Sequence, residues 1–263
     1  MSFKQNLKSI FKFDFCCYFC PMKHFKIKFL SAGNADSIVI SYKNIDNQPC
    51  HIILDSGEKN NFQLLKQELE SLPHVNLLVI THIDNDHIGG LSELVNDATF
   101  FKKGFIQSCW FNAYSKIKQP QQQSGLIGVK EGILLRDVLS QKLDIDLPFV
   151  TTQTTPLDLC NVKILLLADS HPSVIVASLR ALYYSETQKL TVDYMKVSHH
   201  GSRYNTSPEL LSLINCRNLF LQPMDIYTCI LTKLMLFVTI GLSLSYFSNY
   251  PFILLTLNLK YNG

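Results

Sequence analysis

Several features are scarce or absent in this 263-residue chain, and each absence narrows the class of protein. Charge is modest: 17% of the residues are charged, 47% are hydrophobic and the formal net charge is only +3. This composition implies neither long disorder nor a strongly basic nucleic-acid-binding surface, although binding of nucleic acid stays possible. No segment repeats internally. The length leaves room for one large domain or two small ones, with enough core for independent folding.

A disulfide framework is also missing. The chain has eight cysteines, and Cys17 and Cys20 form one C-x-x-C, but no second pair follows at zinc-ribbon spacing. We interpret the cysteines as buried or incidental thiols in a reducing compartment, which predicts a cytoplasmic protein.

The first 21 residues lack a signal-peptide cleavage site. Lysines alternate with aromatic residues there, but Asp14 interrupts the apolar part and no small-residue site follows. We interpret residues 1–21 as an extension, and Met22 as an alternative start of the chain. A domain over residues 22–222 and an atypical tail over 223–263 complete the predicted organisation.

What the chain does contain is a dense polar stretch after an apolar run. The run ends at Ile80 and reads as a buried strand, and Thr81-His-Ile-Asp-Asn-Asp-His-Ile-Gly-Gly90 follows directly. We expect the two glycines to let the backbone turn tightly as the next helix starts. Imidazole nitrogen and carboxylate oxygen together suit a borderline cation, above all Zn²⁺.

Four ligands so closely spaced cannot easily converge on one tetrahedral ion, so two ions completed by residues from elsewhere are expected. The competing interpretation is a polar loop with Asp84 or Asp86 as helix N-cap. That alternative explains one aspartate but neither His82 nor His87. Metal binding is therefore the favoured hypothesis.

The motif H-x-D-x-D-H-x-G-G after a hydrophobic strand resembles the signature of the metallo-β-lactamase fold. The aspartate form is similar to the branch of the β-lactamase-like domain of DNA-uptake channel proteins. The resemblance spans about residues 23–221 and implies an α/β (α+β) fold, a four-layer αβ/βα sandwich, here with an incomplete C-terminal part. It also implies that Asp55, at the end of the strand over 51–54, supports the loop that carries these histidines and aspartates by hydrogen bonding.

Two later blocks extend the resemblance. The apolar strand over 162–168 ends in Asp169, which the resemblance identifies as a ligand that bridges both ions. A second strand ends in His199 and His200, of which only one is expected to contact metal, because adjacent strand side chains point oppositely. We favour His200 as the ligand and His199 as a cleft residue or proton donor. The complete predicted metal set is His82, Asp84, Asp86, His87, Asp169 and His200.

Other polar residues are candidates for the substrate pocket. Arg203 and Asn205 follow the histidine pair within reach of an anionic substrate, and Asn112 ends a strand where relatives place a pocket residue. Asn34 and Asp36 occupy a predicted hairpin loop, where ordinary turn chemistry explains them equally well.

Hydrophobic periodicity predicts alternating strands and helices. The predicted strands cover residues 25–29, 38–40, 51–54, 75–80, 105–111, 162–168, 192–198 and 218–221. The predicted helices cover residues 62–72, 91–95, 126–139, 172–182 and 208–214, the last with Ser207 as N-cap and Pro208 at its first position.

The tail over 226–259 is apolar and departs from the family. It is interpreted either as a C-terminal membrane anchor or as sequence that replaced the end of the domain. We favour replacement, because pocket residues expected of relatives are lost where the apolar run begins. Membrane contact through this segment is the alternative.

Together these features predict a metal-dependent hydrolase with two Zn²⁺ ions, or Mn²⁺ in their place. A metal-bound hydroxide, oriented by Asp86 and assisted by His199, would attack a phosphodiester or other ester. The expected partner is a small-molecule or phosphodiester substrate, and the charge does not indicate nucleic acid. The alternative function is a degenerate, non-catalytic protein of the same fold that binds metal or a partner.

Overall fold

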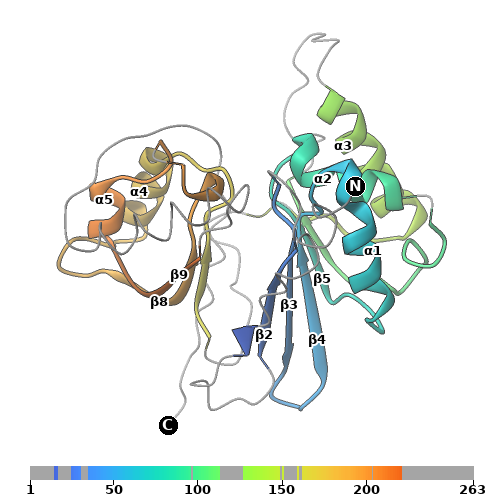
Figure 1. Ribbon diagram of the computed structural model, residues 1–263, viewed down its shortest axis with the longest axis horizontal. Coiled ribbons are helices and arrows are strands. Elements are labelled where there is room, and N and C mark those ends of the chain that lie inside the picture. The colour runs from blue at the N-terminus through green and yellow to red at the C-terminus, as the bar shows by residue number, and fades with distance from the viewer. Residues whose placement is uncertain are drawn as a thin grey trace, which may run out of the picture. The chain divides into compact units, whose positions relative to one another are not determined.

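The structure is a computed structural model that describes residues 15–16, 25–30, 35–95, 97–112, 127–148, 150, 159, 162–202 and 204–220. The chain divides into two compact units, Met1–Phe149 and Val150–Gly263. Each unit has its own sheet and its own helices (Figure 1).

The first unit contains a six-stranded sheet in the order β1-β2-β3-β4-β5-β6. The strands are β1 (Phe15–Cys16), β2 (Lys26–Phe29), β3 (Ile38–Lys43), β4 (Pro49–Leu54), β5 (Leu77–Ile80) and β6 (Cys109–Phe111). Neighbours from β1 to β4 are antiparallel, whereas β4, β5 and β6 run parallel. The predicted opening hairpin is confirmed as β2 and β3. Because β4 and β5 are parallel, their carboxyl ends lie at the same edge of the sheet.

Three helices cover one face of this sheet, as Figure 1 shows. They are α1 (Phe62–Glu70), α2 (Asn85–Leu94) and α3 (Ile127–Asp137), with a 3₁₀ turn η1 (Lys59–Asn61) before α1 and a π-helical turn η3 (Val138–Lys142) after α3. Helices α1 and α3 formed close to the predicted ranges 62–72 and 126–139, whereas α2 starts at Asn85, before the predicted range 91–95. Apolar spacing works because residues three or four apart share one face of a helix.

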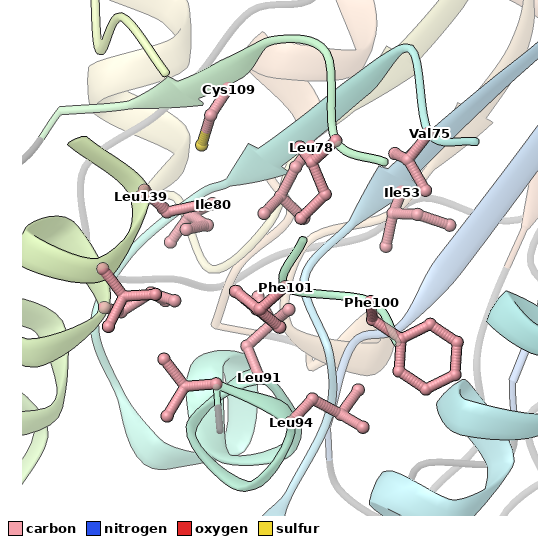
Figure 2. Close-up of a cluster of buried hydrophobic side chains, with 14 of the residues drawn as sticks. Ile53, Val75, Leu78, Ile80, Leu91, Leu94, Phe100, Phe101, Cys109 and Leu139 are labelled. Carbon is pink, nitrogen blue, oxygen red and sulfur yellow. The ribbon is translucent and has the colours of Figure 1, made fainter. Parts of the chain in front are cut away.

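The core of the first unit lies between these helices and the sheet. Figure 2 shows Ile53, Leu78 and Ile80 of the strands pointing toward Leu91 and Leu94 of α2. These five side chains are at most 2% exposed. Burying each contributes roughly 1.5–3 kcal/mol relative to exposure, so this layer fixes α2 against the end of β5.

The second unit contains a three-stranded parallel sheet in the order β7-β8-β9. Its strands are β7 (Ile164–Leu166), β8 (Leu190–Lys196) and β9 (Ile214–Phe220), and its helices are α4 (Pro172–Ala181) and α5 (Pro208–Ser212). Both helices pack on one face of the sheet around Leu179 and Leu210. The predicted cap of α5 is confirmed, because Ser207 Oγ accepts a hydrogen bond from the Leu210 amide at 3.0 Å.

The fold is thus mixed α/β, as the sequence predicts, but the four-layer sandwich is not what the described residues form. They form two separate sheets, one of six strands and one of only three parallel strands. The periodicity correctly gave strands and helices, but alternation alone does not fix how many strands join each sheet. The strand predicted over 218–221 is longer than expected and starts at Ile214.

The predicted extension over 1–21 and the tail over 223–263 fall almost entirely outside the described residues. Among the residues that the structure does describe, no helix has the length and apolar character needed to cross a membrane.

Candidate functional site

The candidate site of the first unit begins where β5 ends. All four residues of β5 are buried, and the chain then leaves the sheet through the loop Thr81-His82-Ile83-Asp84, called here the metal loop, before α2 starts at Asn85. His87 lies in the first turn of α2 and is fully buried. The two histidines and two aspartates of the motif therefore lie on one loop and one helical turn.

Asp55 joins this loop from the neighbouring strand β4. Its Oδ2 lies 2.8 Å from His87 Nδ1 and accepts a hydrogen bond from the Thr81 hydroxyl at 2.5 Å, while its Oδ1 accepts from the Thr81 amide at 2.8 Å. Asp55 is 1% exposed. A buried carboxylate needs such donors, and here they fix both the metal loop and the His87 ring.

This contact bears on the tautomer of His87. A proton on Nδ1 can be donated to the Asp55 carboxylate, and the ring lone pair is then on Nε2. Nε2 lies 3.7 Å from Asp86 Oδ2. Imidazoles that bind metals are commonly oriented in this way by a carboxylate on the other ring nitrogen.

His82 lies beside His87. The two ring centroids are 3.7 Å apart, and His82 Nε2 is 3.8 Å from Asp84 Oδ2. The other nitrogen, Nδ1, lies 2.9 Å from the Thr81 hydroxyl. Thr81 thus contacts both Asp55 and His82, and it connects the orientation of the two imidazoles.

Asp55, His82 and His87 each offer one atom within 4.8 Å of the others, a grouping that could hold a metal ion. Imidazole nitrogen with carboxylate oxygen is a suitable donor set for a divalent transition metal. Because both Asp55 oxygens already accept hydrogen bonds, we assign Asp55 mainly to orienting His87. The carboxylates of Asp84 and Asp86 lie near the same imidazoles, with Oδ2 atoms 3.8 Å from His82 Nε2 and 3.7 Å from His87 Nε2.

The N-cap alternative holds for the position of Asp84 but not for its side chain. Asp84 occupies the N-cap position of α2, but its side chain makes no capping hydrogen bond. The carboxylates of Asp84 and Asp86 are 59% and 38% exposed. Both therefore remain accessible beside the two imidazoles.

Gly89 and Gly90 have a different role from the expected tight turn, because both lie inside α2. A Cβ on Gly89 would lie 2.6 Å from the backbone nitrogen of Lys59, and a Cβ on Gly90 would lie 2.5 Å from the backbone oxygen of Ser56. Any larger residue would push α2 off the loop that follows β4. The Ser56 amide also donates to the His87 carbonyl at 2.7 Å, which ties the two segments together.

The second unit holds another pair of predicted site residues. His199 Nδ1 lies 3.1 Å from Asp169 Oδ2, with Asp169 largely buried and His199 more exposed. The His199 amide donates to the Ala168 carbonyl at 2.9 Å, and both Ala168 and His199 have positive φ, 41° and 45°. These rarely adopted conformations bring the two loops together.

The histidine pair does not lie on a strand. β8 ends at Lys196, and His199 and His200 belong to the short 3₁₀ turn η4 (His199–Gly201). The argument that adjacent strand residues point oppositely therefore does not apply to them. The structure describes His199 beside Asp169, while the side chain of His200 lies outside the described part.

Of the remaining candidates, Asn205 lies next to Asp169. It is buried, and its Nδ2 lies 3.5 Å from the Asp169 carbonyl oxygen and 3.4 Å from that of Ser170. Asn112 follows β6 and is half-buried. Asp36 is 3% exposed, and its carbonyl accepts from the Gly57 amide at 2.9 Å. Asn34 and Arg203 lie outside the described residues.

Sequence reasoning missed Thr81. The available signal was a hydroxyl residue between a buried strand and the first histidine, where it can donate to a carboxylate from the neighbouring strand.

A family model described as anti-Pycsar protein Apyc1 matches residues 25–116 of the chain. The matched segment includes β2 to β6, Asp55 and the complete metal loop. Among curated proteins, none matches the chain in sequence.

This match corrects the prediction from the motif. The family that matches is the anti-Pycsar one, so the assignment to the metallo-β-lactamase superfamily is wrong, and so is the general ester-hydrolase function that rested on that assignment. The motif is short, and the prediction extended it to the whole chain. The observation that Asp and His side chains cluster into a group able to hold a metal remains.

Proposed function

We propose that this protein counters a cyclic-nucleotide immune signal by hydrolysing the cyclic nucleotide, with a divalent cation held in the first unit. The observation that carries the proposal is the match of residues 25–116 to the anti-Pycsar family, because that segment contains Asp55, His82 and His87, a group that could hold a metal ion. A signal of this kind is lost when its cyclic phosphodiester is opened.

The residues of the first unit fit a cation by their chemistry. His82 and His87 would bind it through nitrogen, and Asp84 and Asp86 would add carboxylate oxygens that balance its charge. A bound cation would polarise a phosphoryl oxygen of the substrate and lower the pKa of a nearby water molecule. Zn²⁺ is our first choice of ion, with Mn²⁺ second, because two imidazoles favour a borderline metal.

Two neighbouring residues, and Asp86 itself, would support this chemistry beyond holding the ion. Asp55 and Thr81 would hold the two imidazoles in place through the contacts described above. Asp86, with its partly exposed carboxylate, would orient the attacking water.

In the second unit, Asp169 stays a candidate metal ligand and His199 a candidate proton donor, and the two side chains lie side by side. His200, Arg203, Asn205 and Asn112 stay candidates for ligand or substrate contacts.

The test is hydrolysis of a panel of 3′,5′-cyclic purine and pyrimidine nucleotides by the full-length protein, with Zn²⁺ or Mn²⁺ added, followed by chromatography of the linear monophosphates. We expect the double variant His82→Ala/His87→Ala to lose hydrolysis and bound metal together. His74→Ala is the matched control, because His74 lies beside His51 and outside the candidate site. Hydrolysis that persists in the double variant, or a metal-loaded native protein that opens no cyclic nucleotide, would refute the proposal.

A further inference from the structure

Helix α3 lies close to the metal loop at Gly132. A Cβ built on Gly132 would lie 2.9 Å from Ile83 Cγ2, 3.4 Å from Ile83 Cβ and 4.0 Å from Phe111 Cζ. Carbon atoms without a bond between them rarely lie within 3.0 Å of each other, because the contact is repulsive well before that distance. Only glycine fits at this point of α3 without a shift of its neighbour.

The position of Gly132 on the helix supports a packing role. Leu135 and Leu139, three and seven residues further on, are both 0% exposed and belong to the core cluster. Gly132 therefore lies on the core-facing side of α3. A glycine inside a helix costs about 0.5–1 kcal/mol relative to alanine, and the close contact with Ile83 is the compensating reason for it here.

Ile83 transmits this contact to the candidate ligands. It lies between His82 and Asp84 in the chain, and its side chain packs against the core cluster from a partly buried position. Because isoleucine is β-branched, rotation about χ1 tends to bring another carbon toward the space that a new Cβ would fill. The close contact is removed more directly by a movement of the Ile83 backbone, which would displace His82 and Asp84 on either side.

We propose that Gly132 is a positioning residue for the metal loop, acting through Ile83. The size of residue 132 sets how far the loop is held from α3, and so how His82 and Asp84 are presented to a cation. This inference rests on the proposed function, in which His82 and Asp84 bind the metal.

The experiment uses the full chain and measures Zn²⁺ and Mn²⁺ affinity by calorimetric titration. The Gly132→Ala variant should bind the metal about tenfold more weakly than the native protein. This is the lower end of the loss of metal affinity that follows when groups that support metal ligands are altered. A failure of α3 to form cannot cause this, because alanine favours a helix more than glycine does. The matched control is Leu134→Ala, since Leu134 is 50% exposed on the same helix, and its affinity should equal that of the native protein.

Ile83→Ala provides the rescue. It removes the carbon that a new Cβ would meet, so Gly132→Ala should have no further effect in the Ile83→Ala background. If Gly132→Ala weakens metal binding equally in both backgrounds, the effect does not pass through Ile83 and the inference is overturned.

A second measurement separates this inference from the proposed function. The amides of His87 and Ile88 donate to the Asp84 carbonyl at 2.9 and 3.0 Å, so their hydrogen exchange in metal-free protein reports on the metal loop. Both should exchange faster in Gly132→Ala and return to the Ile83→Ala rate in the double variant. If the native protein binds no metal but exchange responds in this way, the proposed function fails and the positioning stands. If metal binds and neither exchange nor affinity changes, the positioning fails alone.

Discussion

Asp55 Oδ2 lies 2.8 Å from His87 Nδ1, although 32 residues separate the two in the chain. The contact forms because β4 and β5 are parallel neighbours, which places the end of β4 next to the loop that leads into α2. A carboxylate from one strand thus sets the imidazole orientation on another element.

Replacement of Asp55 by asparagine tests this relationship. Asp55 has a positive φ of 54°, a conformation that asparagine tolerates, so the backbone should be preserved. An amide can still accept from Thr81, but it removes the charge that favours the Nδ1 proton of His87. We expect metal affinity to fall by about 10–100-fold, as for other groups that orient metal ligands. An unchanged affinity in calorimetric titration would show that Asp55 does not orient His87.

Thr81 can be tested with two substitutions that differ only slightly in shape. Thr81→Val keeps the branched side chain but removes the hydroxyl that contacts Asp55 and His82, so a buried acceptor loses a donor. This should lower the free energy of unfolding by about 1–3 kcal/mol. The Thr81→Ser variant retains the hydroxyl, so its free energy of unfolding should fall less. Urea unfolding of the three proteins measures the difference, and equal loss in both variants would argue against the hydroxyl contacts.

Gly90→Ala should destabilise the first unit. Its Cβ would lie 2.5 Å from a backbone oxygen of Ser56, which cannot move aside as a flexible side chain can. Overpacking of this kind typically costs about 1–3 kcal/mol, and it should exceed the gain in helix propensity. Ser92→Ala, a substitution on the same helix, is the control for the general effect of a new alanine. Thermal unfolding that is unaltered by Gly90→Ala would contradict the close approach of α2.

The thiols of Cys109 and Cys216 should differ in reactivity. Cys109 is fully buried, and burial raises the pKa of its thiol far above the ordinary value, so the reactive thiolate is scarce near neutral pH. Cys216 is less buried, and its thiol pKa is also raised, chiefly by desolvation. With iodoacetamide at pH 8, Cys216 should be modified before Cys109, and Cys109 should react only on unfolding. Mass spectrometry of the digested protein locates the adducts, and early modification of Cys109 would contradict the burial.

Hydrophobic pattern was enough to predict most elements because their apolar faces are encoded locally. The run at β5 and the spacing of Leu65 and Leu69 in α1 are examples, and both elements formed where expected. The sandwich prediction was wrong because strand number and sheet membership depend on pairings between distant segments. The sequence does not state those pairings directly.

The candidate site was predictable to the extent that one short stretch carries it. His82, Asp84, Asp86 and His87 stand together in the chain and stay together in the fold. The roles of Gly89, Gly90 and Gly132 were not predictable in the same way. Each depends on an approach between elements that are far apart in sequence, and a glycine carries no side-chain signal of its partner.

The contact from β4 to α2 also limits how far the motif can be transplanted. A peptide or a grafted loop that copies residues 81–90 would carry four candidate ligands but would omit Asp55. In such a graft the imidazole rings would rotate freely and could exchange tautomers. Ordering them on binding would cost conformational entropy, and the metal affinity would be lower. The smallest transferable unit is therefore the continuous stretch from β4 through β5 to α2, which includes both Asp55 and His87, and not the ten-residue signature.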